Sequence, residues 1–226
     1  MTWIASTGWR AIWRNDNASR WHTFKTLIKQ LESFPSRYGV PVISQVETGI
    51  FTSRYYAHCT ECAFCQSACC LWGVDVDIEN VRRIRACADA LEAYTGVPRA
   101  QWFEGEYTDP EFPGGRYTWT RVLKGACVFL SQSGRGCLLH RFAVENGLDY
   151  HELKPMVSCL FPLTFGDGIL CPTDEAEEHS LICLDSGPTL YRGIRSELTY
   201  YFGDGLVAEL DELEAPALLE IERGSK

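Results

Sequence analysis

The stretch 59–70, CTECAFCQSACC, places five cysteines within twelve residues. They stand at Cys59, Cys62, Cys65, Cys69 and Cys70. Gaps of two or three residues let tight turns direct successive sulphurs at one centre, while backbone N–H groups in such turns offset the negative charge of the thiolates. The C-x2-C-x2-C-x3-C spacing also occurs in bacterial two-cluster ferredoxins. Cys70 replaces the Pro of that pattern and no second run follows, so the stretch predicts a cysteine-bound metal centre rather than a ferredoxin.

Further cysteines lie downstream, beside turn-forming or strand-like sequence. They are Cys127, Cys137, Cys159, Cys171 and Cys183. One cubane cluster or one tetrahedral zinc ion takes four ligands, so five neighbouring thiols cannot all serve one ion and the remote thiols are expected to share the ligation. Cys87 lies within a predicted helix, where a single cysteine is usually a small buried hydrophobe, so we leave it out of the site.

Several chemistries remain open for these thiols. We expect an iron–sulphur cluster, with 4Fe–4S favoured, and zinc is the alternative. A structural zinc ion would act as a staple, although a chain of 226 residues with seven tryptophans should fold without one. A mononuclear non-haem iron enzyme would need an open coordination position and His140 or a carboxylate as ligand. His58 and His140 are candidate ligands, with a surface or supporting role preferred for both.

The composition is that of a compact globular protein, with 46% hydrophobic and 23% charged residues. The net charge of -9 and the pI near 5.1 argue against nucleic acid as a partner, because phosphate binding needs a surplus of Lys and Arg on one face. The sequence shows neither a signal peptide nor an apolar run long enough to cross a membrane, so we expect a cytoplasmic protein with no membrane partner. Cytoplasmic thiols are kept reduced, which favours metal binding over disulphides among the eleven cysteines.

The pattern of apolar residues predicts an α+β fold, an irregular cysteine-rich metal-binding domain with short strands flanked by helices. Helices are expected at 20–34, at 78–94 after the N-cap Asp77, at 141–147, from near Tyr150, at 188–202 and at 204–213. Short strands are expected within 40–57, 117–123, 126–130, 136–140 and 160–171. The turn sequence between the strands at 126–130 and 136–140 would form a hairpin that brings Cys127 close to Cys137.

Three segments are expected along the chain. A helical and strand lead-in, 1–58, packs on the core; the cysteine-cluster domain spans 59–212; and 213–226 forms a C-terminal tail.

An ordered series of motifs resembles a bacterial family. The motifs are CQSACCLWG at 65–73, CVFLSQSGRGCLLH at 127–140, ENGLDYHELKPMVSCLFPLTF at 145–165, and ICLDSG with LYRGIRSELTYYFGDGLVAEL within 182–210. In this order they resemble the bacterial cysteine-cluster proteins described as zinc- or iron-chelating (YkgJ-like), and especially a branch of that group without an assigned activity. The resemblance covers residues 59–212.

This resemblance implies a domain in which about eight cysteines chelate iron or zinc, with no established general activity. The positions that match are Cys65, Cys69, Cys70, Cys127, Cys137, Cys159 and Cys183, with Cys62 or Cys59 as an earlier ligand. Leu160 stands where relatives often carry His, and Cys171 is an addition. A related domain occurs in a flagellin lysine methylase to which an iron–sulphur centre is attributed, which favours iron. No glycine-rich cofactor loop supports carrying methylation over to this chain.

The expected function is therefore that of an iron–sulphur protein used for electron transfer, redox sensing or as part of a modifying enzyme. The alternative is a zinc-binding adaptor whose metal is structural and whose surface binds a partner. The expected partner is a protein or a small-molecule substrate. No catalytic residue is assigned, and enzymatic activity stays open.

Overall fold

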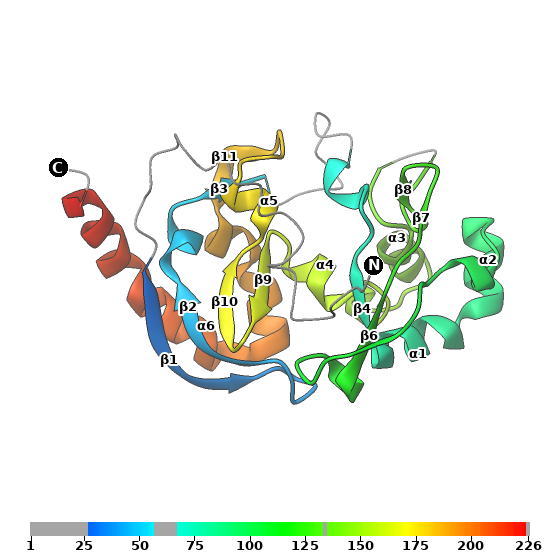
Figure 1. Cartoon of the computed structure of the whole chain (residues 1–226), viewed down its shortest axis with the longest axis horizontal. Helices are drawn as coiled ribbons and strands as arrows, with labels where there is room; N and C mark the ends of the chain where they lie inside the picture. The colour runs from blue at the N-terminus through cyan, green and yellow to red at the C-terminus, as the bar shows by residue number, and fades with distance from the viewer. Residues whose placement is uncertain (1–26, 57–66, 133–134, 225–226) are drawn as a thin grey trace, which may run out of the picture.

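The computed structural model describes residues 27–56, 67–132 and 135–224. Within them the chain is a mixed α+β protein, as predicted, and its strands form several small sheets. Figure 1 shows two groups of elements, one built from 28–56 and 163–224 and the other from 75–145, with the short helix α4 (Met156–Leu160) between them.

The largest sheet has the strand order β1-β2-β10-β9. Its strands are β1 (Ile28–Pro35), β2 (Val42–Glu47), β9 (Leu163–Gly166) and β10 (Ile169–Pro172). β10 runs parallel to β2, and the other neighbours are antiparallel.

The predicted helix at 20–34 is wrong over 28–34, where the chain forms β1, and its residues 20–26 lie outside the described part of the chain. The pairing of β1 with β2 shifts register between Gln30 and Phe34. Between the pairs Gln30–Gln45 and Phe34–Ile43, β1 advances by four residues while β2 advances by two. Leu31 and Phe34 both pack against the core across this irregularity, although they are three residues apart. This spacing resembles the period of a helix.

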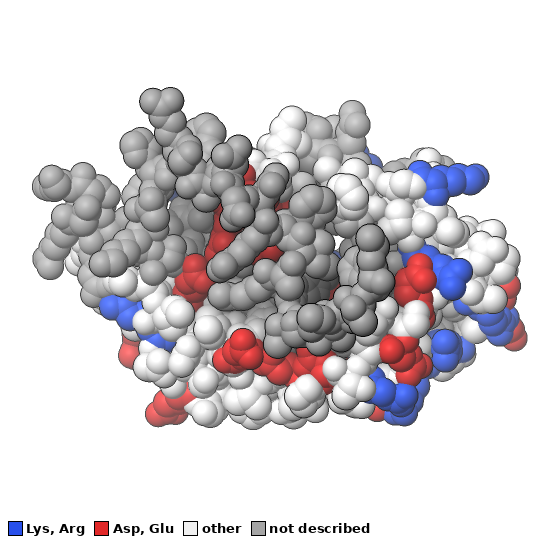
Figure 2. All heavy atoms as spheres, in the orientation of Figure 1, with Lys and Arg blue, Asp and Glu red and all other residues white. Residues whose placement is uncertain are grey.

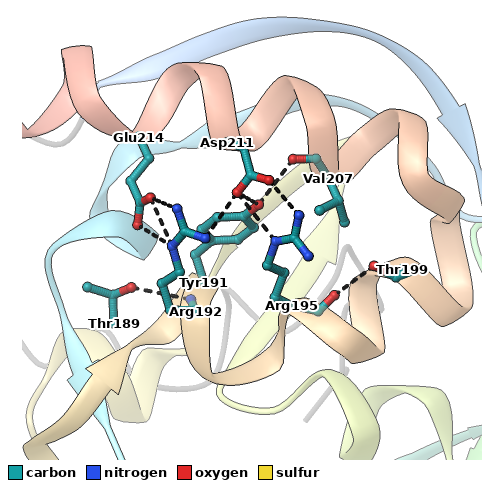
Figure 3. A network of polar contacts seen from close by, with 8 residues as sticks. All are labelled: Thr189, Tyr191, Arg192, Arg195, Thr199, Val207, Asp211 and Glu214. Atoms are coloured by element: carbon teal, nitrogen blue, oxygen red, sulfur yellow. Dashed lines mark hydrogen bonds and ion pairs between the residues drawn. The ribbon is translucent and has the colours of Figure 1, made fainter.

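The long C-terminal helix α6 (Leu190–Gly224) covers this group and is bent at Gly203, whose φ of 82° and ψ of 174° are not helical. The two arms meet the predictions at 188–202 and 204–213, except that the second arm continues to Gly224. Figure 3 shows why the arms stay together: Arg192 pairs with Glu214, and Arg195 pairs with Asp211 across the bend.

At the other end, a three-stranded sheet with the order β4-β6-β5 packs on α1, which contacts α2, and α2 in turn contacts α3. These elements are β4 (Asp75–Asp77), β5 (Tyr107–Thr108), β6 (Arg116–Trp119), α1 (Ile78–Ala86), α2 (Ala88–Thr95) and α3 (Leu138–Glu145). The prediction at Asp77 is confirmed: its Oδ1 accepts a hydrogen bond from the Asn80 N–H at 2.7 Å and caps α1. Cys87 divides the predicted helix in two, and Gly96, in a left-handed conformation, ends it.

The remaining elements are short. They are β3 (Arg54–Tyr55), β7 (Val122–Leu123), β8 (Ala126–Cys127), β11 (Leu184–Thr189), α5 (Asp174–Glu177) and the 3-10 turns η2 (Thr48–Phe51), η3 (Ala68–Cys70), η4 (Arg99–Gln101), η5 (Pro113–Gly115) and η6 (Tyr150–Glu152). The strand predicted at 136–140 is wrong, because α3 begins at Leu138. The helix predicted from near Tyr150 is only the turn η6.

Buried apolar side chains form two clusters, one in each group of elements. The first cluster lies under α6 and includes Cys159 and Cys183, and the second lies between α1, α3 and β8 and includes Cys127. Tyr150 packs against both. The cysteines with remote positions in the sequence are therefore divided between two cores.

The surface is mixed in charge. On the face shown in Figure 2, most basic side chains lie near the α1–α2 end, with a few at the opposite end, and acidic side chains gather along the middle. None of the described helices combines the length and the apolar character needed to cross a membrane.

Candidate metal centre

A pocket of about 410 Å³ lies between the two clusters and is lined by five of the predicted ligands. These are Cys69, Cys70, Cys127, Cys137 and Cys159. They come from four separate parts of the fold: the turn η3, the strand β8, the residue preceding α3, and α4. All eight cysteines that the structure describes are thiols rather than disulphides.

The other predicted ligands do not line this pocket or lie outside the described residues. Cys183 is 3% exposed in the first cluster, and its carbonyl accepts a hydrogen bond from the Tyr56 N–H. Cys171 is buried in β10, and Cys87 lies elsewhere, at the junction of α1 and α2. The candidates outside the described residues are His58, Cys59, Cys62 and Cys65.

A turn between β8 and α3 brings Cys127 and Cys137 to the same pocket. The Leu138 N–H donates to the Phe129 carbonyl at 2.7 Å, and Leu130 and Cys137 form an isolated β-bridge. The segment that the sequence predicts as a hairpin therefore joins a strand to a helix, and both cysteines line the same pocket.

The sulphur atoms have close polar neighbours. Cys69 Sγ and Cys70 Sγ are 3.8 Å apart, and Cys127 Sγ lies 3.2 Å from Thr120 Oγ1. Within 27–56, 67–132 and 135–224, however, no three Cys, His, Asp or Glu side chains lie close enough together to hold one ion. Ligation would therefore require the pocket thiols to turn toward one another.

Burial keeps the thiols of Cys127, Cys137 and Cys159 protonated near neutral pH. It raises the pKa of Cys127 and Cys137, and it raises the pKa of Cys159 to about 11. Backbone N–H groups oppose this effect at Cys127 and Cys137, and the Lys154 ammonium opposes it at Cys137 and Cys159. The surroundings thus already contain donors and a positive charge that would stabilise thiolates once a metal displaced their protons.

A buried hydroxyl beside Cys159 also fits a sulphur-ligated centre. Tyr201 is 1% exposed, and its Oη has no nitrogen or oxygen hydrogen-bond partner among the described residues. Burial and the neighbouring Cys159 sulphur, which accepts a hydrogen bond from this hydroxyl, raise the pKa of Tyr201. A thiol sulphur is a weak acceptor, and a metal-bound thiolate at Cys159 would be a stronger one for this buried donor.

One wall of the pocket carries a hydrogen-bonded group that the sequence did not predict. Glu197, on α6, accepts a hydrogen bond from the Tyr150 hydroxyl at 2.6 Å and lies 2.9 Å from His151 Nε2. His151 Nδ1 lies 2.5 Å from Asp149 Oδ1. Asp149, Tyr150 and His151 are consecutive, but Glu197 reaches them from a distant segment, so no local pattern marks the group.

The same wall contains a stack of rings. His140 stacks on Tyr150, Tyr150 on His151 and His151 on Tyr200, with centroids 4.3, 3.9 and 3.5 Å apart. Arg37 covers the Tyr200 ring at 4.0 Å. His140 lines the pocket, and its pKa is lowered by burial and by Lys154, which leaves a neutral imidazole suited to metal ligation.

Comparison with family models, with curated proteins and with solved structures finds no match for this chain.

Proposed function

We propose that this chain binds an iron–sulphur cluster through the pocket cysteines and serves in electron transfer, redox sensing or as part of a modifying enzyme. The observation that carries this proposal is the meeting of Cys69, Cys70, Cys127, Cys137 and Cys159 around one pocket. A cubane cluster takes four cysteine ligands, so this set offers enough thiols without Cys59, Cys62 or Cys65, whose ligation stays a prediction.

The surroundings of the thiols support such a cluster. When bound, it would supply one-electron redox chemistry. Backbone N–H groups around Cys127 and Cys137, the Lys154 ammonium and the Tyr201 hydroxyl would offset the charge of its ligands. The apolar clusters on both sides would limit the access of water to the centre.

Zinc is a second candidate, and the position of the pocket favours it. Cys159 belongs to the first cluster and Cys127 to the second, so one tetrahedral ion would join the two cores. Such an ion would only stabilise the fold, and the protein would function as an adaptor that binds a partner through its surface.

Metal analysis of protein purified without oxygen separates these candidates. A cluster predicts iron and acid-labile sulphide in equal amounts and a brown protein, whereas zinc predicts a colourless protein that contains neither. The double variant Cys127→Ser/Cys137→Ser should lose the metal, while the matched double variant Cys87→Ser/Cys171→Ser, away from the pocket, should keep it. Wild-type protein without stoichiometric metal would refute both candidates.

A further inference from the structure

We propose that His151 takes up one proton when the pocket centre gains one electron, so that this protein carries out proton-coupled electron transfer. The inference rests on the proposed iron–sulphur function and names the class of reaction that the pocket supports. It stands on the chain of contacts from Glu197 in the pocket wall, through His151, to Asp149 at the surface.

This chain connects the pocket with solvent. Glu197 lines the pocket with only 16% of its side chain exposed, His151 is 12% exposed, and Asp149 is 46% exposed. The distances of 2.9 Å and 2.5 Å allow a hydrogen bond at each ring nitrogen of His151. A proton from water can therefore reach the imidazole through Asp149. Glu197, on the other side of the ring, lines the pocket in which the cluster is proposed to bind.

His151 is held in one position by the residues packed around it. Its ring lies between the rings of Tyr150 and Tyr200, and Tyr201 meets it edge-on at 5.7 Å. Because the ring is already oriented, proton transfer at its nitrogen atoms needs no rotation of the imidazole.

The charged groups around His151 favour its protonated form. Burial alone would lower the pKa of His151, but the Glu197 and Asp149 carboxylates outweigh it and raise this pKa. The other charged or titratable groups that face this site are His140, Tyr150, Lys154, Tyr200, Tyr201 and Arg37. Lys154 and Arg37 add positive charge, so the proton is held mainly by the two carboxylates.

The proposed step balances in charge and in atoms. At a pH where His151 is neutral, its Nε2–H is donated to Glu197 and its Nδ1 faces Asp149. With a cluster bound, a one-electron donor such as dithionite would add an electron to it, and the added negative charge would raise the proton affinity of His151. One proton then passes from solvent through Asp149 to Nδ1, and oxidation releases the same proton.

A simpler role for His151 is that of a structural ion-pair bridge between η6 and α6. That role predicts a reduction potential that does not depend on pH. Proton uptake predicts a reduction potential that falls with pH above the pKa of His151 in the oxidised protein. The slope should be about 59 mV per pH unit, which corresponds to a tenfold change for a one-electron couple.

The test is the reduction potential of the iron-loaded full chain, titrated with dithionite between pH 6 and 9. The wild-type potential should be flat at low pH and then fall along that slope. His151→Gln should abolish the slope, and Asp149→Asn should move its onset to lower pH, because one carboxylate no longer holds the proton. Asp185→Asn is the matched control, because Asp185 pairs with His179 at an exposed site away from the pocket.

Each outcome decides between the two proposals. If iron and sulphide are present but the wild-type potential is flat, or if His151→Gln keeps the slope, the proton inference is wrong and the cluster assignment stands. If the protein holds zinc or no metal, both fall. Should His151→Gln not fold, the partly exposed Asp149→Asn variant still tests the inference, because an unchanged onset would overturn it.

Discussion

The Tyr191 hydroxyl donates a hydrogen bond to Asp211 Oδ1 at 2.7 Å across the bend of α6 (Figure 3). Tyr191 Oη also lies 3.1 Å from the Val207 carbonyl. Asp211 pairs with Arg195 at 2.5 Å, and this guanidinium, together with the Tyr191 hydroxyl, lowers the pKa of Asp211 to about 2. Asp211 thus joins the two arms of the helix through Tyr191 and Arg195, beside the Arg192–Glu214 pair.

This contact predicts an acid-sensitive part of the stability. A carboxyl whose folded pKa lies below its unfolded value contributes stability that is complete above the unfolded pKa, about 3.8, and is lost as pH falls through the folded value of about 2. The difference in unfolding midpoint between wild type and Asp211→Asn should therefore shrink between pH 4 and pH 2. Denaturant unfolding followed by circular dichroism measures it, and Asp204→Asn, exposed at the bend, should show no such trend.

The buried hydroxyl of the same pair gives a second prediction. Tyr191 is fully buried, so Tyr191→Phe leaves the Val207 carbonyl and Asp211 without this donor and should cost about 1–3 kcal/mol of unfolding free energy at pH 7. A cost below the error of denaturant unfolding would show that water replaces the hydroxyl.

The wall of the pocket at Gly73 predicts a coupling between backbone geometry and metal binding. Gly73 has a φ of +80°, and a Cβ there would lie 2.6 Å from the Thr120 carbonyl oxygen. Gly73→Ala should lower the unfolding free energy by about 1–2 kcal/mol through left-handed strain. The clash with the Thr120 carbonyl should lower it by about 1–3 kcal/mol more. Thr120 also contacts Cys127, so the variant should bind less metal as well.

Gly96→Ala is the control for that experiment. Gly96 has a φ of +68°, but a Cβ there meets nothing within 4 Å. It should show the strain alone and keep its full metal content. Equal losses of metal in the two variants would mean that the fit between Gly73 and Thr120 does not shape the site.

The sequence predicted features that depend on neighbouring residues and missed those that depend on distant ones. The start of α1 at Asp77 and the bend at Gly203 follow from local capping and turn chemistry. The strand β1 depends on pairing with β2, and a register shift in this pairing gives its core-facing residues a spacing that resembles the period of a helix. For α3 a signal was present, because Leu139, Phe142 and Ala143 follow helical spacing, but the neighbouring turn and strand-like residues concealed it.

The candidate site shows the same division. The sequence identified the cysteine type and spacing, and five of its predicted ligands line one pocket. Their proximity could not be derived, because it depends on how two cores pack. Glu197 was missed for the same reason: its role comes from His151 and Tyr150, which are more than forty residues away in sequence.

The protonated state of Cys127, Cys137 and Cys159 predicts that metal affinity rises with pH. Each thiol that ligates must lose its proton, so the apparent affinity should rise about tenfold per pH unit for every proton released. Proton release on zinc binding, measured with an indicator dye in weak buffer at pH 7, should fall by one in Cys159→Ser. Cys171→Ser, away from the pocket, should release as many protons as wild type, and a pH-independent affinity would contradict the proposed ligation.

The Asp149–His151–Glu197 group also predicts how the metal-free protein responds to alkali. The pKa of His151 is raised in the folded state because its two carboxylate partners outweigh burial. A group of this kind contributes stability that is complete below the unfolded pKa, about 6.5, and is lost as pH rises through the folded pKa. Urea unfolding of chelator-treated, reduced protein should therefore show the advantage of wild type over His151→Gln declining between pH 6 and pH 8.5. The range stays below the titration of the buried thiols, whose raised pKa values act at higher pH. A difference that stays constant over this range would contradict the prediction. It would show that Asp149 and Glu197 do not raise the pKa of His151 in the folded protein.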